Sequence, residues 1–208
     1  MKTLLLTSAG TDVRDEIINI LPKPASKLKL AQIKTASKVE PDTAYIEKDR
    51  QNFENMGFMV EDVDIEGKTE TELREHLKQF DIVVVQGGNT FYLLKAVQDS
   101  GFDKVIKSLI SKGTIYIGIS AGTVICCPTI ETSGWKSGDK NIVGLKNLAG
   151  LDLVPFNIFV HYNPKYDEII RDNASKSKIK TRILTDDQAF LIKGSKITLV
   201  GEKPEVLL

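Results

Sequence analysis

The segment with the clearest chemical character in this 208-residue sequence is Gly118-Ile119-Ser120-Ala121-Gly122. An apolar, β-branched run at 114–117 precedes it, and residues 123–127 can begin a helix. A strand that passes into a helix through G-x-S-x-G is typical of a nucleophile elbow, in which glycines permit a tight turn and the serine Oγ stands above the sheet. The pattern predicts Ser120 as a nucleophile, although a glycine–serine turn can also do no more than start a helix.

A serine nucleophile needs a base within hydrogen-bond reach and an acid that orients this base. The sequence contains two histidines. His76 lies in a charged helical stretch, which is typical of a solvated residue. His161 follows the apolar run 158–160 and precedes a turn, so it is the predicted base. Four aspartates in loops remain open as the orienting acid: Asp139, Asp152, Asp186 and Asp187.

A second glycine turn, Gln86-Gly87-Gly88-Asn89-Thr90, ends the buried strand expected at 81–85. If this strand neighbours the Ser120 strand, the backbone amides of Gly88 and Ala121 can converge as an oxyanion hole. Removal of one such donor typically raises a reaction barrier by about 3 kcal/mol. A phosphate-binding turn is the alternative, but the sequence contains neither G-x-G-x-x-G nor G-x-x-x-x-G-K-[ST].

The elements that must position these residues alternate between strand and helix. Apolar strands are expected at 3–8, 28–35, 58–65, 81–85 and 114–117, and helices at 12–21, 41–56, 70–79, 91–98 and 102–112. Strands that are apolar throughout predict an α/β fold with a doubly wound, mostly parallel sheet covered on both faces. After a polar loop at 132–139 we expect a strand at 158–160, a helix at 166–175 and a C-terminal β-hairpin formed by 190–193 and 196–200.

Composition narrows the possible functions. Hydrophobic residues make up 41% of the chain, enough for a single domain over 1–208. Lys+Arg and Asp+Glu both number 28, so a nucleic-acid partner is not indicated. No apolar run is long enough to cross a bilayer. The adjacent Cys126 and Cys127 are expected to be reduced core residues of a cytoplasmic protein, and no Cys/His cluster has metal-ligand spacing.

Several motifs together resemble one known family. They are Val-Val-Val-Gln-Gly-Gly-Asn-Thr-Phe at 83–91, the glycine–serine segment at 118–122, Cys-Pro-Thr-Ile at 127–130, and His161 after a strand. The chain resembles the peptidase E (S51) family of serine peptidases, related to cyanophycinase. The resemblance implies a flavodoxin-like fold related to class I glutamine amidotransferases, and hydrolysis of small peptides by serine and histidine without a cofactor. It implies Ser120 as nucleophile, His161 as base, and Gly88 and Ala121 as oxyanion donors.

The chain departs from the family pattern at two places. The dipeptidase branch has an aspartate where this chain has Trp135, whereas a related branch has a glutamate near 185–189, so Asp186 is the expected orienting acid. The dipeptidases bind the substrate aspartate through an arginine after the histidine, where this chain has Lys165. A lysine binds a carboxylate as a point charge and not as a bidentate fork. The expected substrate-binding residues are Asn89, Trp135, Tyr162 and Lys165.

These observations predict a cytoplasmic serine peptidase of small peptides, with N-terminal aspartyl dipeptides as the first substrates to test. It is expected to be a monomer or a homodimer without metal or cofactor. The alternative is a binding module of the same fold with a degenerate site, because the loop aspartate is missing. An amidotransferase-like enzyme with a thiol nucleophile would need cysteine at the elbow, where this chain has Ser120.

Overall fold

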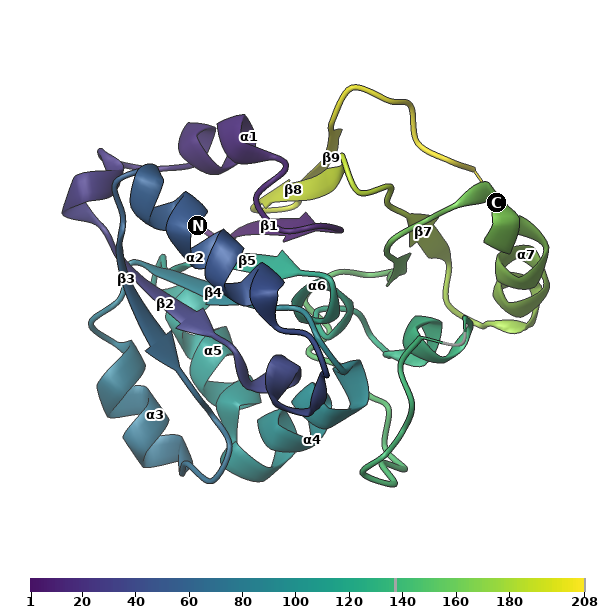
Figure 1. Cartoon of the computed structure of the whole chain (residues 1–208), viewed down its shortest axis with the longest axis horizontal. Coiled ribbons are helices and arrows are strands. Elements are labelled where there is room, and N and C mark those ends of the chain that lie inside the picture. Colours follow the sequence, from purple (N-terminus) through teal and green to yellow (C-terminus); the bar gives the residue numbers. More distant parts are fainter. Residues whose placement is uncertain (137, 208) are drawn as a thin grey trace.

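The computed structural model describes residues 1–136 and 138–207 of the chain. Its centre is a sheet of seven strands in the order β3-β2-β4-β5-β1-β8-β9 (Figure 1). The strands are β1 (Thr3–Thr7), β2 (Lys29–Ile33), β3 (Met59–Val63), β4 (Ile82–Val85), β5 (Ile115–Ile119), β8 (Ala189–Lys193) and β9 (Lys196–Val200). The first five are parallel, and β8 and β9 form an antiparallel hairpin beside β1. The predicted α/β architecture with its C-terminal hairpin is therefore confirmed.

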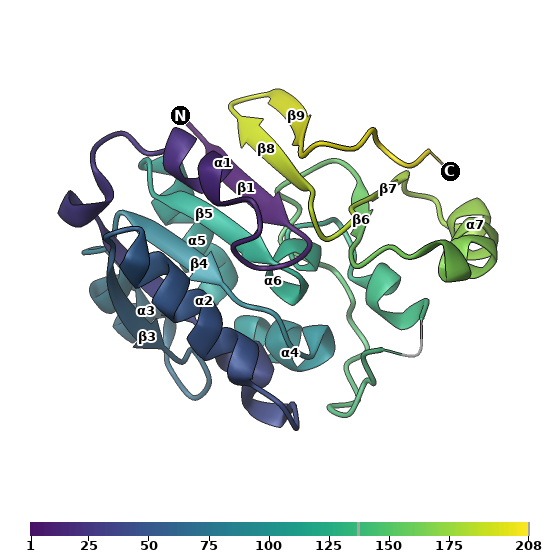
Figure 2. The same cartoon turned by 45° about the horizontal axis from the view of Figure 1, so that its top comes forward.

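Helices cover both faces of this sheet (Figure 2). One face packs against α1 (Arg14–Asn19) and α2 (Ala44–Asn55). The other face packs against α3 (Glu70–Leu77), α4 (Thr90–Ser100) and α5 (Phe102–Ser111).

Strand β4 shows why its sequence is apolar throughout. Ile82 and Val84 belong to the core cluster under α1 and α2, and Val83 and Val85 to the opposite cluster. Successive side chains of a strand point to opposite faces, and here both faces are covered. All four side chains are fully buried.

A smaller unit stands beside the main sheet (Figure 1), and His161 follows its first strand. It consists of β6 (Asn157–Phe159) and β7 (Thr181–Ile183), which pair in parallel, with α7 (Asp167–Lys176). The strand before His161 therefore belongs to a separate two-stranded sheet. The free side of β1 is occupied by β8, which pairs with it over five residues, so β6 has no edge of the main sheet to join there.

Short helical segments complete the chain. They are α6 (Ala121–Val124) and the 3₁₀ helices η1 (Ala25–Lys27), η2 (Thr35–Val39), η3 (Glu131–Gly134) and η4 (Pro164–Tyr166). Within 1–136 and 138–207, no helix combines the length and the apolar character that a bilayer span requires.

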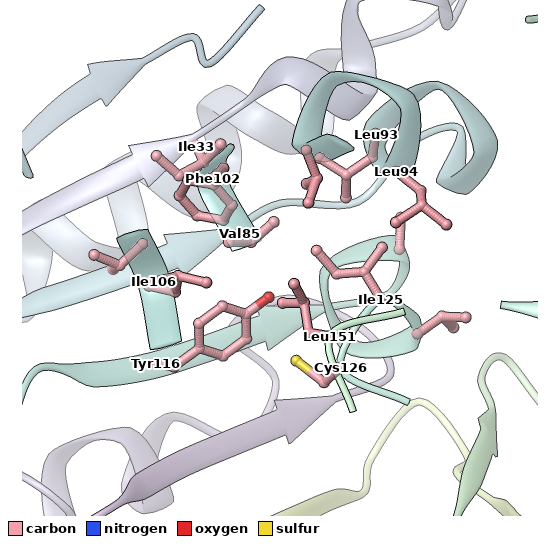
Figure 3. Close-up of a cluster of buried hydrophobic side chains, with 14 of the residues drawn as sticks. Ile33, Val85, Leu93, Leu94, Phe102, Ile106, Tyr116, Ile125, Cys126 and Leu151 are labelled. Carbon is pink, nitrogen blue, oxygen red and sulfur yellow. The ribbon is translucent and has the colours of Figure 1, made fainter. Parts of the chain in front are cut away.

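The core beneath α6 is tightly packed (Figure 3). Tyr116 of β5 is fully buried, and its hydroxyl donates to the carbonyl oxygen of Gly122 at 2.7 Å. Cys126 lies in the same core cluster, and burial raises the pKa of its thiol to about 12. This cysteine is therefore a protonated packing residue, which removes it as a candidate thiol nucleophile.

Candidate active site

Ser120 occupies a strained turn between β5 and α6. Its backbone angles, φ 50° and ψ −108°, lie in a region that residues other than glycine rarely adopt. A Cβ at Gly118 would lie 2.7 Å from the carbonyl oxygen of Gly122, and a Cβ at Gly122 would lie 2.0 Å from that of Val85. Because both positions exclude a side chain, the glycines allow the turn to press against β4. The serine Oγ lines cavities at the carboxyl end of the sheet.

The structure brings His161 and Asp186 to this serine. His161 Nε2 lies 2.8 Å from Ser120 Oγ, and His161 Nδ1 lies 2.6 Å from Asp186 Oδ1. A carboxylate next to Nδ1 selects the tautomer with its proton there, so Nε2 is free to accept from the serine hydroxyl. The hydrogen bond from His161 is the main effect that lowers the pKa of Asp186, against the opposing effect of burial.

The hydrogen bonds of two other candidate acids go to groups other than the histidine. Asp187 accepts from the Thr185 hydroxyl at 2.6 Å and pairs with Lys203 at 3.1 Å. Asp139 accepts from the backbone amide of Thr90 at 2.9 Å. Of the four aspartates that the sequence left open, Asp186 is the one hydrogen-bonded to the histidine.

Ser8 is a further member of this network that the sequence reasoning missed. It follows β1 and is fully buried. Its hydroxyl donates to Asp186 Oδ1 at 2.8 Å and accepts from the backbone amide of His161 at 2.7 Å. One side chain thus holds both the acid and the backbone of the histidine, whose φ is 56°. The available signal was its place at the carboxyl end of a parallel strand, where open α/β sheets bind their ligands.

The turn after β4 lies next to Ser120. A Cβ at Gly87 would approach that of Ser120 to 3.1 Å, and Gly88 lines the same cavity as the serine. Gly88 has a φ of 130°, and a Cβ there would lie 2.4 Å from Ala36. Within the described residues, the amides of Gly88 and Ala121 donate to no backbone carbonyl. Both N–H groups are therefore available to a ligand.

Two cavities meet at the serine, one of about 50 Å³ and one of about 420 Å³. Four residues line both: Ser120, Lys136, Asp139 and His161. The smaller cavity is further bounded by Thr90, Val124, Thr132, Ser133, Phe159 and Val160. The larger one is further lined by Gly10, Asp12, Tyr45, Lys48, Asp49 and Gly88, among others. The larger space matches a small ligand with charged groups.

Two of the predicted substrate-binding residues have other roles. Asn89 is 5% exposed; its Oδ1 accepts from the amide of Tyr92 and caps α4, and its Nδ2 donates to the carbonyl of Lys140. Trp135 is 8% exposed and stacks on Phe159 with ring centroids 6.2 Å apart. Helix capping and core packing therefore already engage these two side chains.

The other two lie on the turn after the histidine and line neither cavity. The hydroxyl of Tyr162 donates to Asp167 at 3.2 Å. Lys165 is exposed, with its Nζ 4.8 Å from the ring centroid of Tyr166. The Asn163 side chain accepts from the amide of Lys165 and caps the start of η4. The lysine that lines both cavities with Ser120 is Lys136, which polar loop composition alone did not single out.

Within 1–136 and 138–207, no cluster of three or more His, Cys, Asp or Glu side chains is arranged to hold a metal ion. The groups around Ser120 are instead a hydroxyl, an imidazole, carboxylates and an ammonium. This set suits acyl transfer by a serine.

The sequence model of peptidase family S51 matches residues 4–200. The chain belongs to peptidase family S51. It is 35% identical over 205 residues to the uncharacterized peptidase Lmo0363 of Listeria monocytogenes, covering 95% of this chain and 97% of that protein. It is 33% identical over 208 residues to peptidase E of a Nostoc species, covering 96% and 78%.

A solved structure agrees with this membership of family S51. The 1.5 Å crystal structure of a protein assigned to peptidase E from Listeria monocytogenes EGD-e superimposes with a TM-score of 0.87 at 32% sequence identity. The match covers 98% of this chain and all of the other. Membership of S51 supports a peptidase as the class of activity.

Proposed function

We propose that this S51 member is a serine peptidase that hydrolyses small peptides, with Ser120 as nucleophile, His161 as general base and acid, and Asp186 as the orienting acid. The observation that carries the proposal is the continuous line of hydrogen bonds from Ser120 through His161 to Asp186, with distances of 2.8 and 2.6 Å. This line opens directly onto the two cavities.

In the proposed reaction, Ser120 Oγ attacks the scissile carbonyl carbon while His161 Nε2 takes the hydroxyl proton. The amides of Gly88 and Ala121 donate to the oxyanion that forms. When the C–N bond breaks, His161 returns the proton to the leaving amine, and an acyl-enzyme remains on Ser120. Water then attacks this ester, His161 takes a proton from the water, and the acid product leaves with the serine hydroxyl restored.

The backbone conformation of Ser120 and the hydrogen bond between Asp186 and His161 both have roles in the proposed reaction. The φ of 50° aims the hydroxyl out of the sheet toward the cavities. The lowered pKa of Asp186 reflects interactions that favour its charged form, and this negative charge stabilises the imidazolium that forms when His161 takes the proton.

Small peptides are the proposed substrates because the larger cavity holds about 420 Å³. N-terminal aspartyl dipeptides remain the first class to test. The sequence suggested Lys165 as the group that binds the aspartate side chain of such peptides. Its Nζ lies over the ring of Tyr166, so a preference for acidic peptides would need another positive group.

The test is covalent labelling with a fluorophosphonate, which reacts with activated serines and needs no known substrate. We expect the wild-type protein to be labelled, and Ser120→Ala and His161→Ala to remain unlabelled. Ser111→Ala is a matched control that should be labelled like wild type, because Ser111 is an exposed serine whose hydroxyl donates to the carbonyl of Ser108. A folded wild-type protein that takes up no label would refute the peptidase and favour the non-hydrolytic binding module.

A further inference from the structure

Lys136 is placed where a substrate would meet it. It lines both the small and the large cavity, together with Ser120 and His161. Its side chain is half-buried, and its Nζ lies 5.3 Å from the ring centroid of Phe159 and 5.9 Å from that of Tyr166. These contacts restrict the positions that the ammonium can occupy next to the cavities.

This ammonium has no anionic partner in the described part of the chain. Its one hydrogen bond there goes to the carbonyl oxygen of Val160 at 3.3 Å, and none of the ion pairs involves it. Asp139 shares both cavities, but its carboxylate is held by the amide of Thr90. Burial lowers the pKa of Lys136, and nearby negative groups offset this effect only in part. A partly desolvated charge without a counterion is unfavourable, so a ligand that supplied one would be bound favourably.

We propose that Lys136 binds a carboxylate group of the peptide substrate beside Ser120. The proposal rests on the proposed peptidase function and adds a recognition element to it. A peptide offers this chemistry from two sources, an acidic side chain and its own C-terminal carboxylate. One group on the enzyme would then both attract the peptide and fix its position relative to the serine.

The other lysines near the site are poorer candidates. Lys48 lines only the larger cavity, and its wall also carries Asp12 and Asp49, which offset its charge. Lys165 lines neither cavity, and its Nζ lies 4.8 Å from the ring centroid of Tyr166.

The experiment measures peptide binding by calorimetry to the full chain carrying Ser120→Ala, so that no hydrolysis occurs. Two peptide pairs separate the sources of the carboxylate. Aspartyl-leucinamide against asparaginyl-leucinamide tests the side chain, and alanyl-leucine against alanyl-leucinamide tests the C-terminus. We expect the carboxylate member of at least one pair to bind about tenfold more tightly, which corresponds to about 1.4 kcal/mol.

Adding Lys136→Met, which keeps an unbranched side chain without the charge, should remove this preference. Adding Lys136→Arg should retain most of it, because the positive charge remains. Lys165→Met is the matched control and should leave the preference unchanged. The proposal is wrong if neither pair shows a carboxylate preference, if no peptide binds, or if the preference survives in a folded Lys136→Met protein. It is also wrong if the preference is lost only in Lys165→Met.

This outcome is separable from that of the proposed function. Fluorophosphonate labelling of the wild type reports on the serine chemistry, whereas the binding comparison is made with the serine removed. A labelled protein without carboxylate preference would refute the role of Lys136 alone. An unlabelled protein that shows the preference would refute the peptidase and leave a carboxylate-binding site.

Discussion

Replacing Ser8 with alanine removes one buried hydroxyl and changes two hydrogen bonds at once. The carboxylate of Asp186 loses a donor at 2.8 Å, and the amide of His161 loses its acceptor at 2.7 Å. A hydrogen bond to a charged group contributes about 1.5–3 kcal/mol. The side chain of Asp186 is 57% exposed, so solvent screening favours the lower end of this range. We therefore expect Ser8→Ala to react with a fluorophosphonate about tenfold more slowly than wild type.

The pH dependence of this reaction gives a second readout that a purely structural role would not change. His161 and then the Ser8 hydroxyl lower the pKa of Asp186, so removal of Ser8 should raise it. A carboxylate with a depressed pKa makes its contribution above that pKa and loses it as the pH falls. The part of the low-pH loss of labelling that comes from protonation of Asp186 should therefore begin at a higher pH in Ser8→Ala.

The assay is the second-order rate of labelling measured across pH, with circular dichroism to show that each variant is folded. Ser8→Thr keeps a hydroxyl on the same backbone position and is expected to restore most of the rate. A folded Ser8→Ala with the wild-type rate and the wild-type pH profile would refute the argument that Ser8 positions Asp186 and His161.

Three further outcomes follow from particular contacts. Asp186→Asn should keep the fold but slow labelling by up to about 10⁴-fold, because an amide no longer selects the reactive tautomer of the histidine; a rate close to that of wild type would remove this residue from the mechanism. Gly122→Ala should lower the free energy of unfolding in urea by about 3 kcal/mol or more, since its Cβ would lie 2.0 Å from the carbonyl oxygen of Val85. Gly134→Ala, whose Cβ would meet only Phe91 at 3.9 Å, is the control and should be far milder. The thiol of Cys126, fully buried and with its pKa raised to about 12, should resist a thiol reagent in the native protein and react on unfolding; rapid reaction in native buffer would contradict this assignment.

The fold was largely predictable because its signals are local. The run at 82–85 is apolar at every position, and this pattern predicts a strand covered on both faces, which β4 is. The spacing of glycines around Ser120 predicted a sharp strand-to-helix turn, and the positions that exclude a Cβ explain why no other residue fits there. Such features depend on neighbours in the chain, so a single sequence contains them.

The residues around the site were less predictable because their directions depend on distant parts of the chain. Trp135 and Lys136 are adjacent in one loop, yet the ring packs on Phe159 while the ammonium lines the cavities. Asp186 and Asp187 are also adjacent, and only the first meets the histidine. Neither sequence pattern nor residue type distinguishes the members of these pairs, since the choice depends on which face of a loop packs inward.

The sequence by itself determined the kinds of groups present, the strands and helices that carry them, and the backbone freedom at 118 and 122. Tertiary structure alone decided which groups meet. Ser8 reaches Asp186 across 178 positions of the chain and the backbone of His161 across 153. Contacts of such long range form only when the strands pair and the smaller β6–β7 unit docks beside them, because packing of the whole chain and not local preference brings these atoms together.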